Sequence, residues 1–155
     1  MLNVARARLS MTDDALRDTK TWFKGKEQPN GLFYWQAHGF YMTEQTAVSG
    51  LITEFLLQSV DNIIRVFPSW PGDKDAEFTN LRARGGFLVS AQQKNGSIQA
   101  LKIESTAGGD LKLVSPWKST GVRYADGNEV LLTPDSSGVV HVSTTRGQQL
   151  EFVKK

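Results

Sequence analysis

Two periodicities of apolar residues divide the chain. Up to about residue 62, apolar positions recur three and four residues apart, which is the spacing of one face of an α-helix. After Ile63 they come in short runs separated by Gly, Asn and Asp, as in β-strands joined by tight turns. The pattern changes within Phe55–Pro71, so the sequence predicts a helical part, residues 1–62, followed by a strand-rich part, residues 63–155.

Three helices are predicted in the first part. Residues 2–9 show a helical pattern, and a second helix is expected from a Ser10 cap to Gly25. The third is expected over Thr43–Val60. Its apolar stripe consists of Val48, Leu51, Ile52, Phe55, Leu56 and Ser59. Because these helices are too few to form a bundle of their own, this stripe is expected to pack on the strand-rich part or on protein outside this chain.

The second part predicts seven or so short strands. The clearest turn is Asn95-Gly96, because a type I′ hairpin turn needs positive φ at both central residues. The expected strands are Ile63–Phe67, Phe87–Gln93, Ile98–Ser105, Leu111–Val114, Glu129–Thr133, Val139–Thr144 and Gln148–Val153. Short strands at near-regular spacing favour an antiparallel sandwich, so the predicted fold class is α+β, with terminal helices preceding a C-terminal β-sandwich.

Composition excludes several classes of function. The chain has 155 residues, no cysteine and a net charge of +2. Thiol chemistry and cysteine-ligated metals are therefore excluded, and the scattered basic residues form no stripe for nucleic acid. His38 and His141 are too far apart in the sequence to predict a metal site, and no cofactor is expected. No apolar stretch could span a bilayer, and the N-terminus lacks the apolar core of a signal peptide.

The segment between the second and third helices is rich in aromatic residues. Tyr34 and Trp35 lie in it, among glycines and a proline that break any helix. Aromatic rings mostly serve burial, so one interpretation is a loop packed on a neighbouring helix. The alternative is a sugar-facing surface, since flat rings stack on the C–H faces of pyranoses. Tyr34 and Trp35 are accordingly the candidate substrate-binding residues.

Three short sequence motifs resemble those of a known protein family. They are Leu56-Leu57-Gln58-Ser59, Ile64–Pro71 and Leu81–Phe87, and Ser115-Pro116-Trp117 adds a fourth. Together they resemble the C-terminal end of bacterial glycoside hydrolases related to family 95, the α-L-fucosidase family. In those enzymes the last helix of an (α/α)6 barrel ends in a motif like Leu56–Ser59, and a linker then leads into a β-sandwich. The resemblance thus implies that residues 1–62 are the end of an incomplete barrel.

The resemblance also limits the chemistry. Family 95 enzymes are similar to inverting glycosidases, which use one carboxylic acid for the leaving oxygen and one base for the attacking water. The family's acid lies upstream of the matched region, which implies that this chain is a C-terminal piece. A further family Asp precedes the last helix, but here Gln36–Gln45 contains no Asp. Either another residue takes its place, with Glu44 and His38 as the candidate catalytic residues, or the chemistry differs. A helix dipole would also favour Glu44.

The expected function is that of a C-terminal fragment of an α-L-fucosidase-like glycoside hydrolase, which supports the barrel instead of carrying full catalysis. The expected partner is a glycan bound through the parent barrel, with no nucleic acid and no membrane. If the parent is exported, the location is periplasmic or extracellular. The alternative is a stand-alone carbohydrate-binding or structural β-sandwich module that performs no catalysis.

Overall fold

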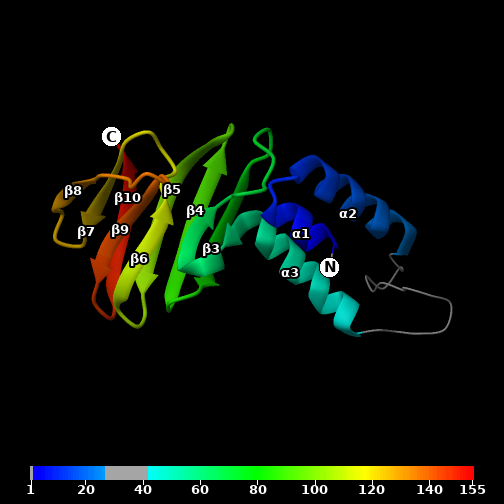
Figure 1. The fold of residues 1–155 in the computed structure, drawn as a ribbon, viewed down its shortest axis with the longest axis horizontal. Helices are drawn as coiled ribbons and strands as arrows, with labels where there is room; N and C mark the ends of the chain where they lie inside the picture. The colour runs from blue at the N-terminus through cyan, green and yellow to red at the C-terminus, as the bar shows by residue number, and fades with distance from the viewer. Residues whose placement is uncertain (1, 27–41) are drawn as a thin grey trace. The chain divides into compact units, whose positions relative to one another are not determined.

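The helices and the strands of the chain fall into two units. The computed structural model describes residues 2–26 and 42–155, with side chains over 3–24 and 49–155. One unit contains the three helices and residues Pro68–Pro71, and the other contains Leu57–Phe67 and Gly72–Lys155. The predicted α+β class, with helices preceding a mostly antiparallel sandwich, is confirmed (Figure 1).

The helical unit consists of α1 (Leu2–Arg8), α2 (Thr12–Lys26) and α3 (Met42–Leu56). Small side chains let these helices approach closely, because Ala7 and Ala15 are only 1% and 0% exposed. Leu51 and Phe55 of α3 complete this buried cluster. Helix α1 contacts both α2 and α3, so its Ala7 connects Ala15 of α2 with Leu51 and Phe55 of α3 in one buried cluster.

The start of α2 differs from the prediction. Ser10 has a φ of 58° and lies in the turn after α1, so it does not cap the helix. The backbone N–H of Ala15 donates to the Met11 oxygen at 3.0 Å, which makes Met11 the first acceptor of the helix. The acidic first turn was correctly placed, with Asp13 and Asp14 near the positive end of the helix dipole.

The end of α3 also differs from the prediction. The helix ends at Leu56, and Leu57–Gln58 form a short strand instead of the last helical turn. The predicted stripe is correct at Leu51 and Phe55, but Ile52 is 44% exposed and Leu56 is half-buried. Leu57 is only 4% exposed, because the change to extended backbone turns it into the interior in place of Leu56.

A segment between two strands belongs to the helical unit. The Ser69 N–H donates to the Phe55 oxygen at 3.4 Å, and its hydroxyl donates to the Ala7 oxygen. Trp70 packs against the buried cluster of the helices. The side chain of Ser69 is thus 1% exposed, and this segment ties α1 to α3.

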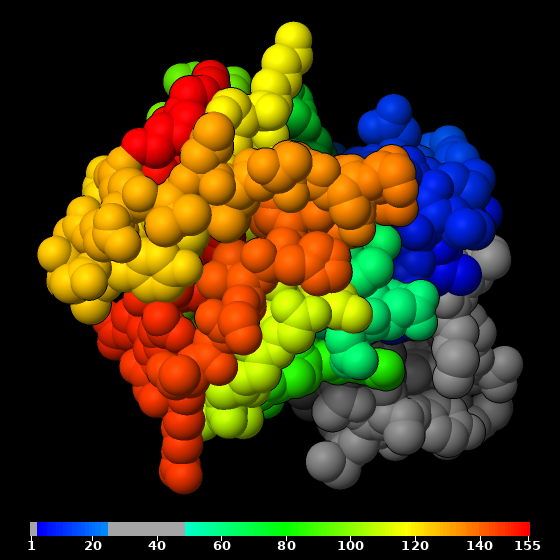
Figure 2. Space-filling view, turned by 60° about the vertical axis from the view of Figure 1, so that its left-hand side comes forward, coloured from blue at the N-terminus to red at the C-terminus, as the bar shows by residue number. Residues whose placement is uncertain are grey.

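The other unit is built from ten strands in two sheets. In chain order they are β1 (Leu57–Gln58), β2 (Ile63–Val66), β3 (Ala76–Ala83), β4 (Phe87–Lys94), β5 (Ser97–Ser105), β6 (Gly109–Val114), β7 (Thr120–Tyr124), β8 (Glu129–Leu132), β9 (Val139–Thr144) and β10 (Gln148–Lys154). The smaller sheet has the order β1-β2-β6-β9, and the larger has the order β3-β4-β5-β10-β7-β8. All pairs are antiparallel except β2 with β6. Figure 2 shows β9, β6 and β2 following one another across the smaller sheet.

Strand alternation places one apolar layer between the sheets. In β4, buried and half-buried residues alternate from Phe87 to Gln93. In β9 from Val140 onward, and in β10, buried residues likewise alternate with more exposed ones. The largest fully buried side chains are Ile64, Leu101, Ile103, Leu111, Leu113 and Leu150. The residues between them face outward on each sheet.

The predicted hairpin is confirmed. Asn95 and Gly96 have φ values of 50° and 71°, and Lys94 pairs with Ser97. Besides β1, the strands β3 and β7 were missed, because their patterns are interrupted. Asn80, with a φ of 56°, falls where the register of β3 shifts, and Gly121 is the second residue of β7.

Buried hydroxyls join four strands at one end of the sandwich. Ser105 Oγ lies 2.8 Å from Thr144 Oγ1, and it accepts from the Gly108 N–H at 3.1 Å. Thr144 in turn donates to the Gly109 oxygen at 2.7 Å. The Gly147 N–H donates to the Ser105 oxygen at 2.7 Å, so β5, β6, β9 and β10 are linked by satisfied polar groups.

We expect Ser105→Ala to lower the free energy of unfolding by about 1–3 kcal/mol, because it leaves the Gly108 N–H without its acceptor. Urea unfolding followed by tryptophan fluorescence would measure the change. Ser143→Ala is the matched control, since Ser143 is exposed on β9 and should change stability by less than about 0.5 kcal/mol. Equal effects of the two substitutions would contradict the role given to Ser105.

We expect Gly86→Ala to destabilise the protein more than Gly127→Ala. Both glycines have positive φ, 81° and 84°, which costs an L-residue about 1–2 kcal/mol. A Cβ at Gly86 would also lie 2.8 Å from Ala107 Cβ, whereas one at Gly127 would meet nothing within 4 Å. Urea unfolding of the two variants should therefore separate overpacking from backbone strain, and a larger loss for Gly127→Ala would be the contrary result.

Candidate functional site

The four sequence-derived site residues lie outside the described side chains. Tyr34, Trp35 and His38 fall in residues 27–41, outside the described residues. Glu44 belongs to the first turn of α3, but its side chain is likewise outside the described part. Their roles in catalysis and sugar binding therefore stay predictions, and the site geometry must be built from the remaining residues.

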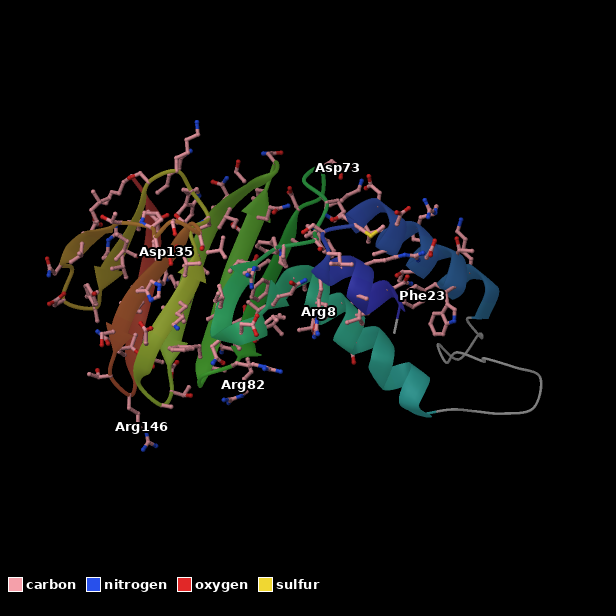
Figure 3. The ribbon with its side chains drawn as sticks, in the orientation of Figure 1. Arg8, Phe23, Asp73, Arg82, Asp135 and Arg146 are labelled. Atoms are coloured by element: carbon pink, nitrogen blue, oxygen red, sulfur yellow. The ribbon has the colours of Figure 1, made fainter. Side chains whose placement is uncertain are left out.

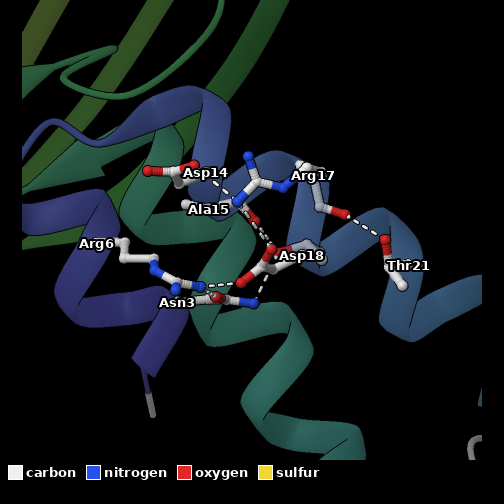
Figure 4. Close-up of polar contacts among 8 residues, drawn as sticks. Asn3, Arg6, Asp14, Ala15, Arg17, Asp18 and Thr21 are labelled. Atoms are coloured by element: carbon white, nitrogen blue, oxygen red, sulfur yellow. Dashed lines mark hydrogen bonds and ion pairs between the residues drawn. The ribbon is translucent and has the colours of Figure 1, made fainter.

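The polar contacts of the helical unit hold helices together (Figure 4). Arg6 of α1 pairs with Asp18 of α2, and Asn3 Nδ2 donates to Thr19 Oγ1 at 3.3 Å. Arg17 pairs with Asp14 one turn away, at 2.7 Å. The hydrogen bond and charge of Asp14 raise the pKa of the Arg17 guanidinium. Each charged side chain in this network is paired with one of opposite charge, so we infer that the network stabilises the helical unit.

The outer face of the larger sheet carries a row of alternating charges. Lys102 of β5 lies beside Glu151 of β10, with Nζ and Oε1 3.8 Å apart. Arg123 of β7 follows, and its Nη1 donates to Glu151 Oε2 at 2.7 Å. Its Nε donates to Glu129 Oε1 of β8 at 2.6 Å. Lys155 also pairs with Glu129, so positive and negative charges alternate from Lys102 to Lys155 along the row.

These contacts shift the pKa values of two members of the row, Glu129 and Arg123. The hydrogen bond to Lys155, and then that to Arg123, holds the pKa of Glu129 below its ordinary value. Bonds to Glu129 and Glu151 raise the pKa of Arg123. Glu129 and Arg123 are therefore held in their charged forms, and the ion pairs of the row link β5, β10, β7 and β8.

Two hollows adjoin this row. The first, of about 430 Å³, is lined by Asn80, Leu88, Ser90, Lys102, Ile103, Glu104, Arg123, Tyr124, Ala125, Gly127, Gln149, Leu150 and Glu151. The second, of about 440 Å³, is lined by Tyr124, Ala125, Asp126, Gly147, Gln148 and Gln149. Three residues, Tyr124, Ala125 and Gln149, line both, so the hollows are neighbours; we call them together the sheet groove.

A second polar cluster surrounds His141 of β9. Its Nδ1 lies 3.4 Å from Asp110 Oδ2, and its Nε2 lies 3.4 Å from Asp135 Oδ2. Asp135 also accepts from the N–H groups of Val139 and Ser137, at 3.0 and 2.8 Å. These backbone bonds, Val139 first, and then His141 lower the pKa of Asp135. Asp135 therefore closes the loop before β9, where Figure 3 labels it.

We expect the stability of Asp135→Asn to fall less than that of the wild type as the pH is lowered from neutral. Since the folded-state pKa is lowered, the carboxylate stabilises the fold above the ordinary aspartate pKa of about 3.9. That stabilisation is lost as the pH falls through the folded-state value. Melting temperatures of the wild type and Asp135→Asn should differ most at neutral pH and converge in acid. A difference that is independent of pH would contradict this assignment.

The described residues contain no cluster of three His, Asp or Glu side chains that could hold a metal ion. Within the same residues, no helix has the length and apolar content needed to cross a membrane.

Sequence reasoning missed the residues of the charge row and the sheet groove. The sequence does contain a local pattern for a polar strand face. Lys102 and Glu104 are two positions apart and so share one face of a strand, and the same holds for Gln149 and Glu151. The pairing of β5 with β10 joins strands far apart in the sequence, however, and no local pattern specifies that register.

Comparison with known proteins identifies the sandwich. A family model described as glycoside hydrolase family 95, C-terminal domain, matches residues 58–152, which run from β1 into β10. No curated protein matches the chain. The match includes all residues of the charge row except Lys155, and it covers more than half of the chain. The chain therefore belongs to glycoside hydrolase family 95, whose C-terminal domain is formed here by residues 58–152.

Proposed function

We propose that the chain is the C-terminal part of an α-L-fucosidase-like glycoside hydrolase and that it supports a catalytic (α/α)6 barrel without catalysing hydrolysis alone. The observation that carries this proposal is the family match over residues 58–152, which covers the sandwich and leaves the candidate catalytic residues outside it. The substrate of the parent enzyme would be a glycan, and an exported parent would place it in the periplasm or outside the cell.

The ionisation of the sandwich supports a non-catalytic role. A general acid in a glycosidase needs a raised pKa, so that it is protonated when it meets the leaving oxygen. Among the described carboxyl groups with shifted pKa values, Glu129 and Asp135 are both shifted down. Such groups stay ionised at neutral pH, which suits structural ion pairs and not proton donation.

The helical unit supports the barrel part of the proposal. Leu9, Met11 and Ile52 are 72%, 44% and 44% exposed, although each is strongly apolar. Further helices of a barrel would cover such side chains. We propose that residues 1–62 form the end of that barrel, ahead of the sandwich at 63–155. Glu44 and His38 would face its active site, with Tyr34 and Trp35 against the sugar.

The first arm of the test uses the chain alone, which should not hydrolyse nitrophenyl α-L-fucoside, galactoside or arabinoside. The reason is that a complete acid–base pair requires residues from the parent barrel. Released nitrophenol would be compared with that of a Glu44→Ala, His38→Ala double variant. Turnover clearly above this control would show that the chain carries its own catalytic pair and would overturn the proposal.

The second arm tests support of a barrel. The chain would replace the corresponding C-terminal part of a family 95 enzyme, and fucosidase activity of the chimera would be measured. Soluble, active protein is expected from the chimera, whereas a barrel truncated at the same point should aggregate or lose activity. A truncated barrel as stable and active as the chimera would contradict the supporting role.

A further inference from the structure

The sheet groove lies on the outer face of the larger sheet. Ile103 and Leu150, which line it, are 1% and 2% exposed because their side chains point into the core. Only their backbone can therefore form the floor of the groove. Its walls come from their outward-facing neighbours, Lys102 and Glu104 on β5 and Gln149 and Glu151 on β10.

Two cross-strand rows arrange the walls. Glu104 is the direct partner of Leu88 on one side and of Gln149 on the other. Lys102 occupies the next row, beside Ser90 and Glu151. Same-face rows of a sheet are about 7 Å apart and neighbouring strands about 4.8 Å apart. Carboxylate, amide and ammonium groups are thus spread over an area comparable to a sugar ring.

Several of these groups retain unused hydrogen-bonding capacity. Within the part of the chain that the structure describes, Glu104 and Gln149 have no side-chain partner. Arg123 uses Nε and Nη1 for Glu129 and Glu151, which leaves Nη2 available. The charge row meanwhile holds the guanidinium in place, so its remaining donors are oriented before any ligand arrives.

The charge of the groove selects the class of ligand. Lys102 and Arg123 balance Glu104 and Glu151 in the first hollow, and Asp126 of the second hollow brings the formal charge of the sheet groove to −1. A phosphate or a polyanion would gain nothing from this balance, and a basic peptide would meet only one net negative charge. A neutral molecule with many hydroxyls can donate to Glu104 and accept from Arg123 and Gln149 at the same time.

We propose that the sheet groove binds a neutral oligosaccharide. Each hollow, at about 430 and 440 Å³, falls within the roughly 300–1,000 Å³ of ligand pockets, and the two adjoin at Tyr124 and Gln149. An extended ligand can therefore run from β4 and β5 toward the turn between β9 and β10. The groove would hold the glycan near the enzyme without acting on it. The choice of glycans for the test rests on the proposed function.

The experiment is isothermal titration of the whole 155-residue chain with fucosyllactose and a fucosylated xyloglucan oligosaccharide, with oligogalacturonide as the acidic comparison. Binding of at least one neutral glycan is expected, and weaker binding of the acidic one. Glu104→Ala and Gln149→Ala should each weaken binding roughly tenfold, the effect of losing a hydrogen bond to the ligand. Perturbation of backbone amide NMR signals in β5, β7 and β10 should locate the ligand in the groove.

Glu77→Ala is the matched control. Glu77 is an exposed glutamate of β3 on the same sheet, where it accepts from Gln92 Nε2 at 2.8 Å, and it does not line the groove. Its replacement should leave binding unchanged. The proposal is overturned by an absence of neutral-glycan binding at millimolar concentration, by preference for the acidic glycan, or by equal losses for Glu77→Ala and Glu104→Ala. Because binding is read without turnover, failure here leaves the barrel-supporting role standing.

Discussion

Burial of one apolar layer between two sheets is the interaction on which the rest of the sandwich depends. Ile64, Leu111 and Leu113 of the smaller sheet are less than 2% exposed, as are Leu101 and Val122 of the larger. Because side chains alternate along a strand, fixing these residues inward fixes every neighbour outward. Burial at about 25 cal/mol per Å² far exceeds what the exposed ion pairs can contribute. The charge row is thus positioned by the core and does not create it.

The unequal widths of the two sheets have a second consequence. Val130 of β8 pairs with buried Val122 and so takes the inward orientation, yet Val130 is 41% exposed. The smaller sheet therefore does not cover the inner side of β8. The charged partners of Glu129 at the start of β8 give this short edge strand a polar border, which disfavours pairing with other chains.

The sequence predicted what local physics determines. Asn95-Gly96 was readable because positive φ is a property of those two residues, and the runs around Val89 and Ile103 alternate without interruption. The end of α3 was misplaced because Leu57 favours a helix by its own propensity, which the tertiary pairing with Val66 overrides. The sheet groove was unreadable because it needs the register of β5 on β10, strands separated by four others in the sequence.

The segment Pro68–Pro71 belongs to the helical unit, although in the sequence it lies between two strands of the other unit. Its prolines restrict the backbone on either side of Ser69 and Trp70, which lowers the entropy lost when both residues become ordered. The Ser69 hydroxyl reaches α1, its N–H reaches α3, and Trp70 packs on the cluster that both helices share. The helical core is therefore completed by residues that come between β2 and β3 in the chain. The described cluster of Ala7, Ala15, Leu51 and Phe55 is small, so the indole of Trp70 adds substantially to the apolar surface that the helices bury.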